Sequence, residues 1–162
     1  MSQDRMHSAA SHIALLAPVP LEHLQDGADI CNREGRVAFG SRAWELFREL
    51  DLQRKGMPVD VYIYPSHKSV PLGFHASWHG IYIGHVESQN GAHPEGMRVR
   101  PPSTAKYSED NIGYWAVFWE VTNLRELSTA ERIPLSHLTG FGKPKAYKAG
   151  FIPEGPLLIE HP

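Results

Sequence analysis

The stretch Val59-Asp-Val-Tyr-Ile-Tyr64 alternates strictly between two kinds of side chain. Aliphatic residues alternate with an acid and two tyrosines, which is the period expected of a β-strand with two unlike faces. A second strand is predicted over Trp78-His-Gly-Ile-Tyr-Ile-Gly-His-Val86, where two glycines allow a bend or a close approach. These two strands predict a sheet in the middle of the chain.

Outward from this pair, short apolar runs predict further strands at Ile13–Ala17, Val37–Gly40, Tyr114–Val121, Ile133–Leu135 and Leu157–Ile159. The apolar residues between Ala43 and Leu50 recur at helical spacing, and Ser41 is placed to cap that helix. Leu21–Asp26 is expected to form one helical turn. The polar stretch Glu87–Asn111 is long for a loop in a compact domain, which is typical of a functional or disordered segment.

Strands outnumber helices, and they follow one another too closely for repeated βαβ crossovers. The pattern therefore predicts the α+β class. The expected architecture is a small curled mixed β-sheet, or a partly closed β-barrel, with peripheral helices. With 162 residues, the chain is expected to have a flexible N-terminal leader over residues 1–12 and a single domain over residues 13–162.

Composition narrows the function classes. The apolar run Ile13–Leu21 is too short to cross a bilayer, and the polar start of the chain is unlike a secretory signal, so we expect a cytoplasmic protein without a membrane partner. A single cysteine, Cys31, excludes a disulfide framework and a cysteine-clustered zinc site. His75 and His79 would lie about 13 Å apart along a strand, too far to share a metal ion. We therefore expect neither a metal nor a cofactor.

The net charge of −2 gives the whole chain no attraction for polyanions, but two segments are locally basic. Met97–Lys106 and Thr139–Phe151 each contain basic residues and no acidic ones. Trp115, Val117, Trp119 and Val121 fall on one face of a predicted strand and are expected in the core. Tyr64 and Trp78, at strand ends beside polar residues, are instead placed to stack on a planar base.

Five segments, in this order, resemble the PUA-like superfamily and most closely its EVE-domain branch, which is related to YTH and ASCH domains. They are Phe39-Gly-Ser-Arg-Ala-Trp44, Val59–His67, Gly80–Val86, Tyr114-Trp-Ala-Val117 and Ile133-Pro-Leu135. The sequence departs from the EVE pattern at Ser41, Pro65 and Tyr114.

The resemblance implies a non-catalytic reader that binds DNA or RNA and accommodates a flipped-out, modified base in an aromatic pocket. The predicted base-pocket residues are Phe39, Gly40, Ser41, Tyr64, Ser66 and Trp78. The predicted phosphate contacts are Arg98, Arg100, Lys106, Lys143 and Lys145.

Two other functions stay open at this point, as does the oligomeric state. The ASCH branch includes amidohydrolases of modified nucleosides, and Thr104, Lys106 and Glu109 could provide the Lys, Thr and Glu of such a site. A protein-interaction module would instead use all its aromatic residues in the core and have no concave aromatic site.

Overall fold

A computed structural model describes residues 12–66 and 75–162. The predicted leader, apart from His12, lies outside these residues, as does His67 at the end of the second segment that resembles the EVE branch. Within the described part of the chain, no helix is both long and apolar enough to cross a membrane.

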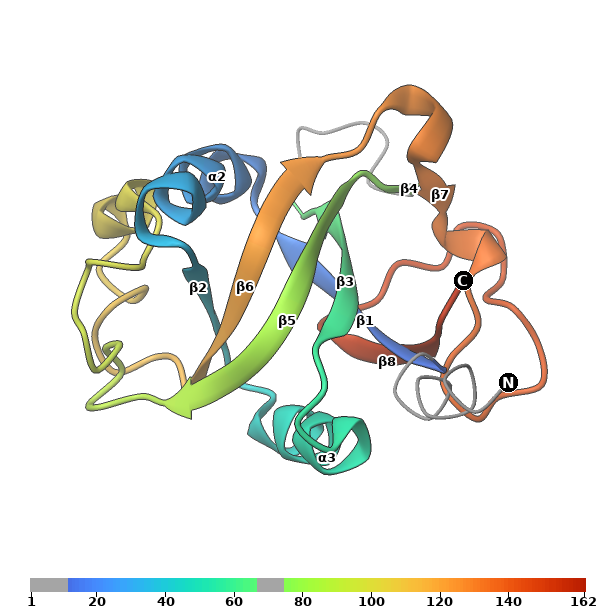
Figure 1. Ribbon diagram of the computed structural model, residues 1–162, viewed down its shortest axis with the longest axis horizontal. Helices are drawn as coiled ribbons and strands as arrows, with labels where there is room; N and C mark the ends of the chain where they lie inside the picture. The colour runs from blue at the N-terminus through green and yellow to red at the C-terminus, as the bar shows by residue number, and fades with distance from the viewer. Residues whose placement is uncertain (1–11, 67–74) are drawn as a thin grey trace.

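One sheet of six strands organises the molecule (Figure 1). Only the β1–β3 pair is parallel, so the sheet is mixed, and the predicted α+β class is confirmed. The sheet does not close into a barrel, because β2 and β8 lie at its opposite ends. From one end to the other, the strands are β2 (Val37–Ser41), β6 (Val117–Glu126), β5 (Trp78–Glu87), β3 (Val59–Pro65), β1 (Ile13–Val19) and β8 (Leu157–Glu160).

Two helices and several short elements complete the fold. The helices α2 (Leu21–Glu34) and α3 (Trp44–Arg54) both contribute to the largest cluster of buried apolar residues, on one face of the sheet. The opposite face is covered by two smaller clusters. The short elements are the strand pair β4 (His75–Ala76) and β7 (Ile133–Pro134), and the 3₁₀ turns η1 (Pro102–Lys106), η2 (Thr129–Glu131) and η3 (Leu135–His137).

The predicted central pair is confirmed, because β3 and β5 are antiparallel neighbours with Val61 opposite Gly80. The glycine is needed for close packing between strands. A Cβ atom at Gly80 would lie 2.3 Å from a methyl carbon of Val121 on β6, so any larger residue would push the two strands apart.

The helix α2 is longer than the single turn predicted over Leu21–Asp26, and that expectation is wrong. The helix presents a narrow buried stripe that includes Leu24, Gly27 and Ile30, and packing of that stripe stabilises a segment of weak helix propensity. Gly27 lets the ring of Phe39 approach, since a Cβ atom there would lie 3.2 Å from it. The helix ends at Gly35, which has a left-handed conformation and donates to the carbonyl of Cys31.

The helix α3 begins later than predicted. Its N-cap residue is Ala43, so Ser41 precedes the cap and does not bind the first-turn amides. The Ser41 hydroxyl accepts a hydrogen bond from the Ala43 amide at 3.0 Å instead. The contact fixes the turn between β2 and α3.

The strand β6 begins at Val117, three residues later than predicted. Val117, Trp119 and Val121 share the main core as expected, but Trp115 does not, because it precedes the strand and packs against the opposite face. The indole of Trp115 lies directly over Gly40, where a Cβ atom would be 2.4 Å from the ring.

That close approach predicts a stability effect. Gly40→Ala should lower the free energy of unfolding by about 1–3 kcal/mol, because the added methyl group must displace the Trp115 ring. Urea denaturation followed by tryptophan fluorescence would measure the loss. Gly155→Ala is the matched control, since a Cβ atom at Gly155 meets nothing within 4 Å. Equal stability of the two variants would show that Trp115 does not hold this position.

The segment between β5 and β6 is ordered by one buried side chain, Arg100, which is only 2% exposed. Its guanidinium donates to the carbonyl oxygen of Ala38 at 2.9 Å, to that of Asp110 at 2.9 Å and to the side-chain oxygen of Asn111 at 3.0 Å. The arginine thereby ties three parts of the chain together. The expected alternative of disorder is therefore wrong for this segment, which is an ordered cover over the β2 end of the sheet.

Both edge strands are covered by neighbouring segments. At β2, the outward amide of Ala38 donates to the Val99 carbonyl, and its outward carbonyl accepts from Arg100. At β8, the amide of Phe141 donates to the Leu158 carbonyl, and the amide of Glu160 donates to the Thr139 carbonyl. At both edges of the sheet, outward-facing backbone groups are therefore hydrogen-bonded to neighbouring segments of the chain.

Candidate functional site

The predicted base-pocket residues do not surround a common hollow. Phe39 and Trp78 are buried in the main core on the helix-covered face of the sheet, and Phe39 packs against Trp119 with ring centroids 5.0 Å apart. Tyr64 is buried in the cluster on the opposite face. Ser66 is exposed beyond the end of β3. The sheet itself separates the two aromatic groups.

The predicted Gly40–Ser41 wall of the pocket is also occupied. Trp115 covers Gly40, and the Ser41 hydroxyl is used within the β2–α3 turn. Trp78 is buried as well, and its indole Nε1 donates to no acceptor among the described residues. A buried donor of this kind normally finds a partner.

In the first basic segment, Met97–Lys106, the cations are either paired with carboxylates of this chain or buried. Arg98 pairs with Glu34 and Glu95, and the Lys106 ammonium lies 3.4 Å from the Glu22 carboxylate. Arg100 is buried and bound to backbone carbonyls, which removes it from any surface that a phosphate could reach. This segment does not form a surface of unpaired cations.

The alternative amidohydrolase residues do not converge. Thr104 is buried, and its hydroxyl donates to the Pro101 carbonyl at 2.7 Å. Lys106 extends to the surface and pairs with Glu22 on α2, while Glu109 is exposed. A lysine general base would need burial beside a pocket, and this lysine is exposed.

The second basic segment has a different character. It forms the loop Gly140–Phe151, between η3 and β8, and is held by short backbone contacts. The Tyr147 amide donates to the Leu138 carbonyl at 2.9 Å, and the Phe151 amide donates to the Lys148 carbonyl at 3.1 Å. Two glycines, Gly142 and Gly150, adopt positive φ angles that the turns require. We call this segment the basic loop.

Two aromatic rings lie together on the basic loop. The ring centroids of Tyr147 and Phe151 are 4.8 Å apart, with the ring planes tilted by 33°. Tyr147 packs against the buried cluster beneath, and burial raises the pKa of its hydroxyl, whereas Phe151 is 40% exposed. The Tyr147 ring is therefore held against the core, whereas the Phe151 ring has a surface that a ligand can contact.

A buried tyrosine holds the loop from below. The Tyr64 hydroxyl donates to the carbonyl of Pro153, two residues after Phe151, at 2.8 Å. Burial raises the pKa of Tyr64 to about 12, so the hydroxyl keeps its proton at neutral pH. Tyr64, predicted to stack on a base, instead supports the segment that carries the exposed ring.

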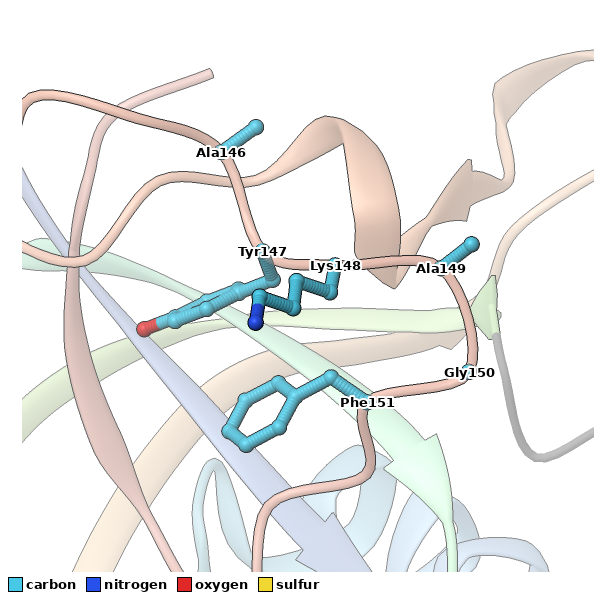
Figure 2. A pocket seen from close by; sticks show the side chains of 6 residues that line it. All are labelled: Ala146, Tyr147, Lys148, Ala149, Gly150 and Phe151. Carbon is cyan, nitrogen blue, oxygen red and sulfur yellow. The ribbon is translucent and has the colours of Figure 1, made fainter.

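The rings line a shallow recess of about 450 Å³. Figure 2 shows Tyr147, Lys148 and Phe151 projecting to the same side of the loop, while Ala146 and Ala149 point away. The volume lies within the roughly 300–1,000 Å³ typical of small-molecule sites. The recess is large enough for a flat ring system and offers aromatic surface with a cation beside it.

The same loop has three exposed lysines, namely Lys143, Lys145 and Lys148. In the described part of the chain, none of them forms an ion pair with a carboxylate. Of the predicted phosphate-binding residues, Lys143 and Lys145 are therefore the two that are exposed and have no carboxylate partner among the described residues. Sequence reasoning identified these two lysines but missed Tyr147 and Phe151, whose signal is their position inside a Gly-rich basic segment.

Several histidines contact acidic side chains. His79 and His161 contact opposite oxygens of Asp60 at 2.7 and 2.6 Å, and these contacts, opposed by burial, lower the pKa of Asp60. His93 Nε2 lies 2.7 Å from Glu120. Over residues 12–66 and 75–162, no group of three or more histidine, cysteine or acidic side chains is arranged to hold a metal ion.

Comparison with protein-family profiles, with curated proteins and with solved structures finds no match to this chain.

Proposed function

We propose that the protein binds single-stranded or unstacked nucleic acid through the basic loop Gly140–Phe151. The observation that carries this proposal is the pair of neighbouring rings, Tyr147 and Phe151, on a loop whose three lysines pair with no carboxylate in the described part of the chain. Proteins that bind single strands combine a cationic surface for the backbone with aromatic side chains on which bases stack. The basic loop has both components within twelve residues of chain, from Gly140 to Phe151.

Each component has a distinct role in the proposed complex. Phe151 offers its exposed face to one base, while Tyr147 supports it from the buried side. A base stacked on an aromatic side chain contributes about 1–3 kcal/mol. The lysines neutralise the phosphates on either side of that base, which adds affinity that depends on salt but carries no sequence information.

The resemblance to the EVE branch supports the same class of partner. It adds the expectation that the bound base is modified and turned out of its stack, at a cost of a few kcal/mol that stacking must recover. The site proposed here differs from the one that the resemblance implied, because the basic loop takes the place of Phe39, Tyr64 and Trp78.

The proposal predicts a specific salt dependence. Binding to a single strand loses affinity with salt at about −0.7 in the logarithmic slope for each phosphate contacted, so three lysines give a slope of about −2. Lys143→Glu with Lys145→Glu should flatten the slope by about 1.4 and weaken binding at least about tenfold at low salt. Fluorescence anisotropy with labelled poly-dT and poly-U twelve-mers, at several salt concentrations, measures both quantities.

The control is Lys55→Glu, an exposed lysine after α3 whose change in charge is the same per residue. It should leave the slope nearly unchanged. If the wild-type protein binds neither oligonucleotide, or if the Lys55 variant loses as much slope per lysine changed, the basic loop is not the binding site.

A further inference from the structure

A second surface combines cations with aromatic rings, far from the basic loop in sequence. The Arg42 guanidinium lies over the Tyr114 ring at 5.2 Å from its centroid, and the Arg48 guanidinium lies over the Trp44 ring at 5.3 Å. We call these four residues the Arg–aromatic corner. Cation–π pairs occur about once per 70–80 residues in proteins, so two exposed pairs on neighbouring segments are uncommon.

The fold brings the two pairs together. Arg42 and Trp44 lie on the β2–α3 turn, where the Trp44 amide donates to the Arg42 carbonyl at 2.9 Å. Tyr114 comes from the approach to β6, which is fixed to the end of β2 by a hydrogen bond from the Ala116 amide to the Ser41 carbonyl. The end of β2 pairs with the start of β6, with Ser41 opposite Val117, and Figure 1 shows the chain passing from the end of β2 into α3.

The corner is exposed, and its two arginines form no ion pair among the described residues. Trp44 is 47% exposed and Tyr114 is 41% exposed. Within residues 12–66 and 75–162, neither Arg42 nor Arg48 forms an ion pair with a carboxylate, whereas Arg36, Arg54, Arg98, Arg125 and Arg132 all do. A guanidinium stacked on a ring keeps its donor edges free and fixed in direction, which suits bidentate recognition of a carboxylate.

We propose that the Arg–aromatic corner docks an acidic segment of a partner protein, with carboxylates on Arg42 and Arg48 and an apolar side chain against Trp44. Arginine, tryptophan and tyrosine are the residue types that dominate binding energy in protein interfaces.

The neighbouring charges distinguish a protein from a nucleic acid here. Glu45 and Glu49 are exposed on α3 and are spaced one helical turn apart, as are Trp44 and Arg48 beside them. Two carboxylates beside the arginines would repel a continuous phosphate backbone. A protein segment of mixed composition can place its own cations or neutral residues there, so the charge pattern favours protein over polyanion.

An array of synthetic dodecapeptides tests this proposal with the full chain. Each peptide has a central Leu, Phe or Trp, one Asp or Glu on each side of it and Ser, Gly or Lys elsewhere, and a matched peptide has Asn or Gln in place of the two acids. We expect a subset of the acidic peptides to bind and the matched peptides not to bind. Arg42→Gln with Arg48→Gln, and separately Trp44→Ala, should each weaken that binding at least about tenfold.

Controls separate this surface from the basic loop. Arg33→Gln, at an exposed arginine on α2, and the Lys143→Glu, Lys145→Glu variant should leave peptide affinity unchanged, with circular dichroism confirming the fold of every variant. The proposal is overturned if no acidic peptide binds, or if binding survives loss of both arginines. It is also overturned if those arginine changes reduce oligonucleotide affinity as much as the lysine changes do, or if size-exclusion chromatography shows a dimer of the chain that they dissociate.

Discussion

Replacing Arg100 with methionine should lower the free energy of unfolding by about 3–5 kcal/mol, the largest stability loss that we expect from one substitution. The methionine fills similar space, but the acceptors on Ala38, Asp110 and Asn111 lose their donor. Each buried acceptor left without a partner costs about 1–3 kcal/mol. Asp110 also loses the cation that faces it at 3.9 Å.

Arg100 is charged as well as buried, so methionine removes both the hydrogen-bond donors and the positive charge beside Asp110. Burial lowers the pKa of Arg100 to about 10, against the opposing attraction of Asp110, so the guanidinium stays charged at neutral pH. The charged guanidinium is tolerated in the interior because its N–H groups donate to three acceptors. Urea denaturation monitored by circular dichroism would measure the loss.

Arg98→Met is the matched control, since that arginine is exposed and belongs to a surface ion-pair network. Surface pairs of this kind contribute little to stability, so the urea midpoint should hardly move. A small effect at Arg100, equal to that at Arg98, would mean that the β5–β6 segment is held by other contacts.

Removing both rings of the basic loop should abolish most of the proposed oligonucleotide binding. Tyr147→Ala combined with Phe151→Ala is expected to weaken affinity for the poly-dT twelve-mer about 30-fold or more, which corresponds to at least about 2 kcal/mol of lost stacking. The salt slope should stay near its wild-type value, because the lysines remain. Anisotropy titrations at two salt concentrations distinguish loss of stacking from loss of charge.

Two further variants interpret that result. Phe151→Leu keeps an apolar side chain but has no ring, so it should lose most of the affinity that Phe151→Ala loses. Tyr107→Ala removes an exposed ring outside the loop and should change nothing. Because Tyr147 packs against the core, each variant needs an unfolding curve. Full affinity in the folded double variant would exclude these rings from the site.

The central strands were predictable because their pattern is local. The alternation from Val59 to Tyr64 and the two glycines of the next strand are visible in the sequence, and both strands form where expected. The extent of α2 was not predictable in this way. Its buried stripe is narrow, and it packs against Phe39 on the next strand and Leu124 on β6, contacts that form only in the folded chain.

The candidate site was partly predictable for the same reason. A run of lysines without acids marks Lys143 and Lys145, and the fold leaves them exposed. The burial of Phe39, Tyr64 and Trp78 depends on which face of the sheet each residue occupies, and only the assembled sheet decides that. Arg100 resembles a surface cation in sequence, because backbone carbonyls that accept from it leave no sequence pattern.

The covered margins of the sheet have a consequence for how the protein behaves at high concentration. An unpaired edge strand can form backbone hydrogen bonds with a strand of another chain, and repeated pairing of this kind can start a fibril. Here backbone groups of Ala38 on one side, and of Leu158 and Glu160 on the other, are already hydrogen-bonded to flanking segments, so they are not free to pair with a second chain. Crowded solutions of the folded protein should therefore stay free of amyloid-like polymers until one of these flanking segments detaches.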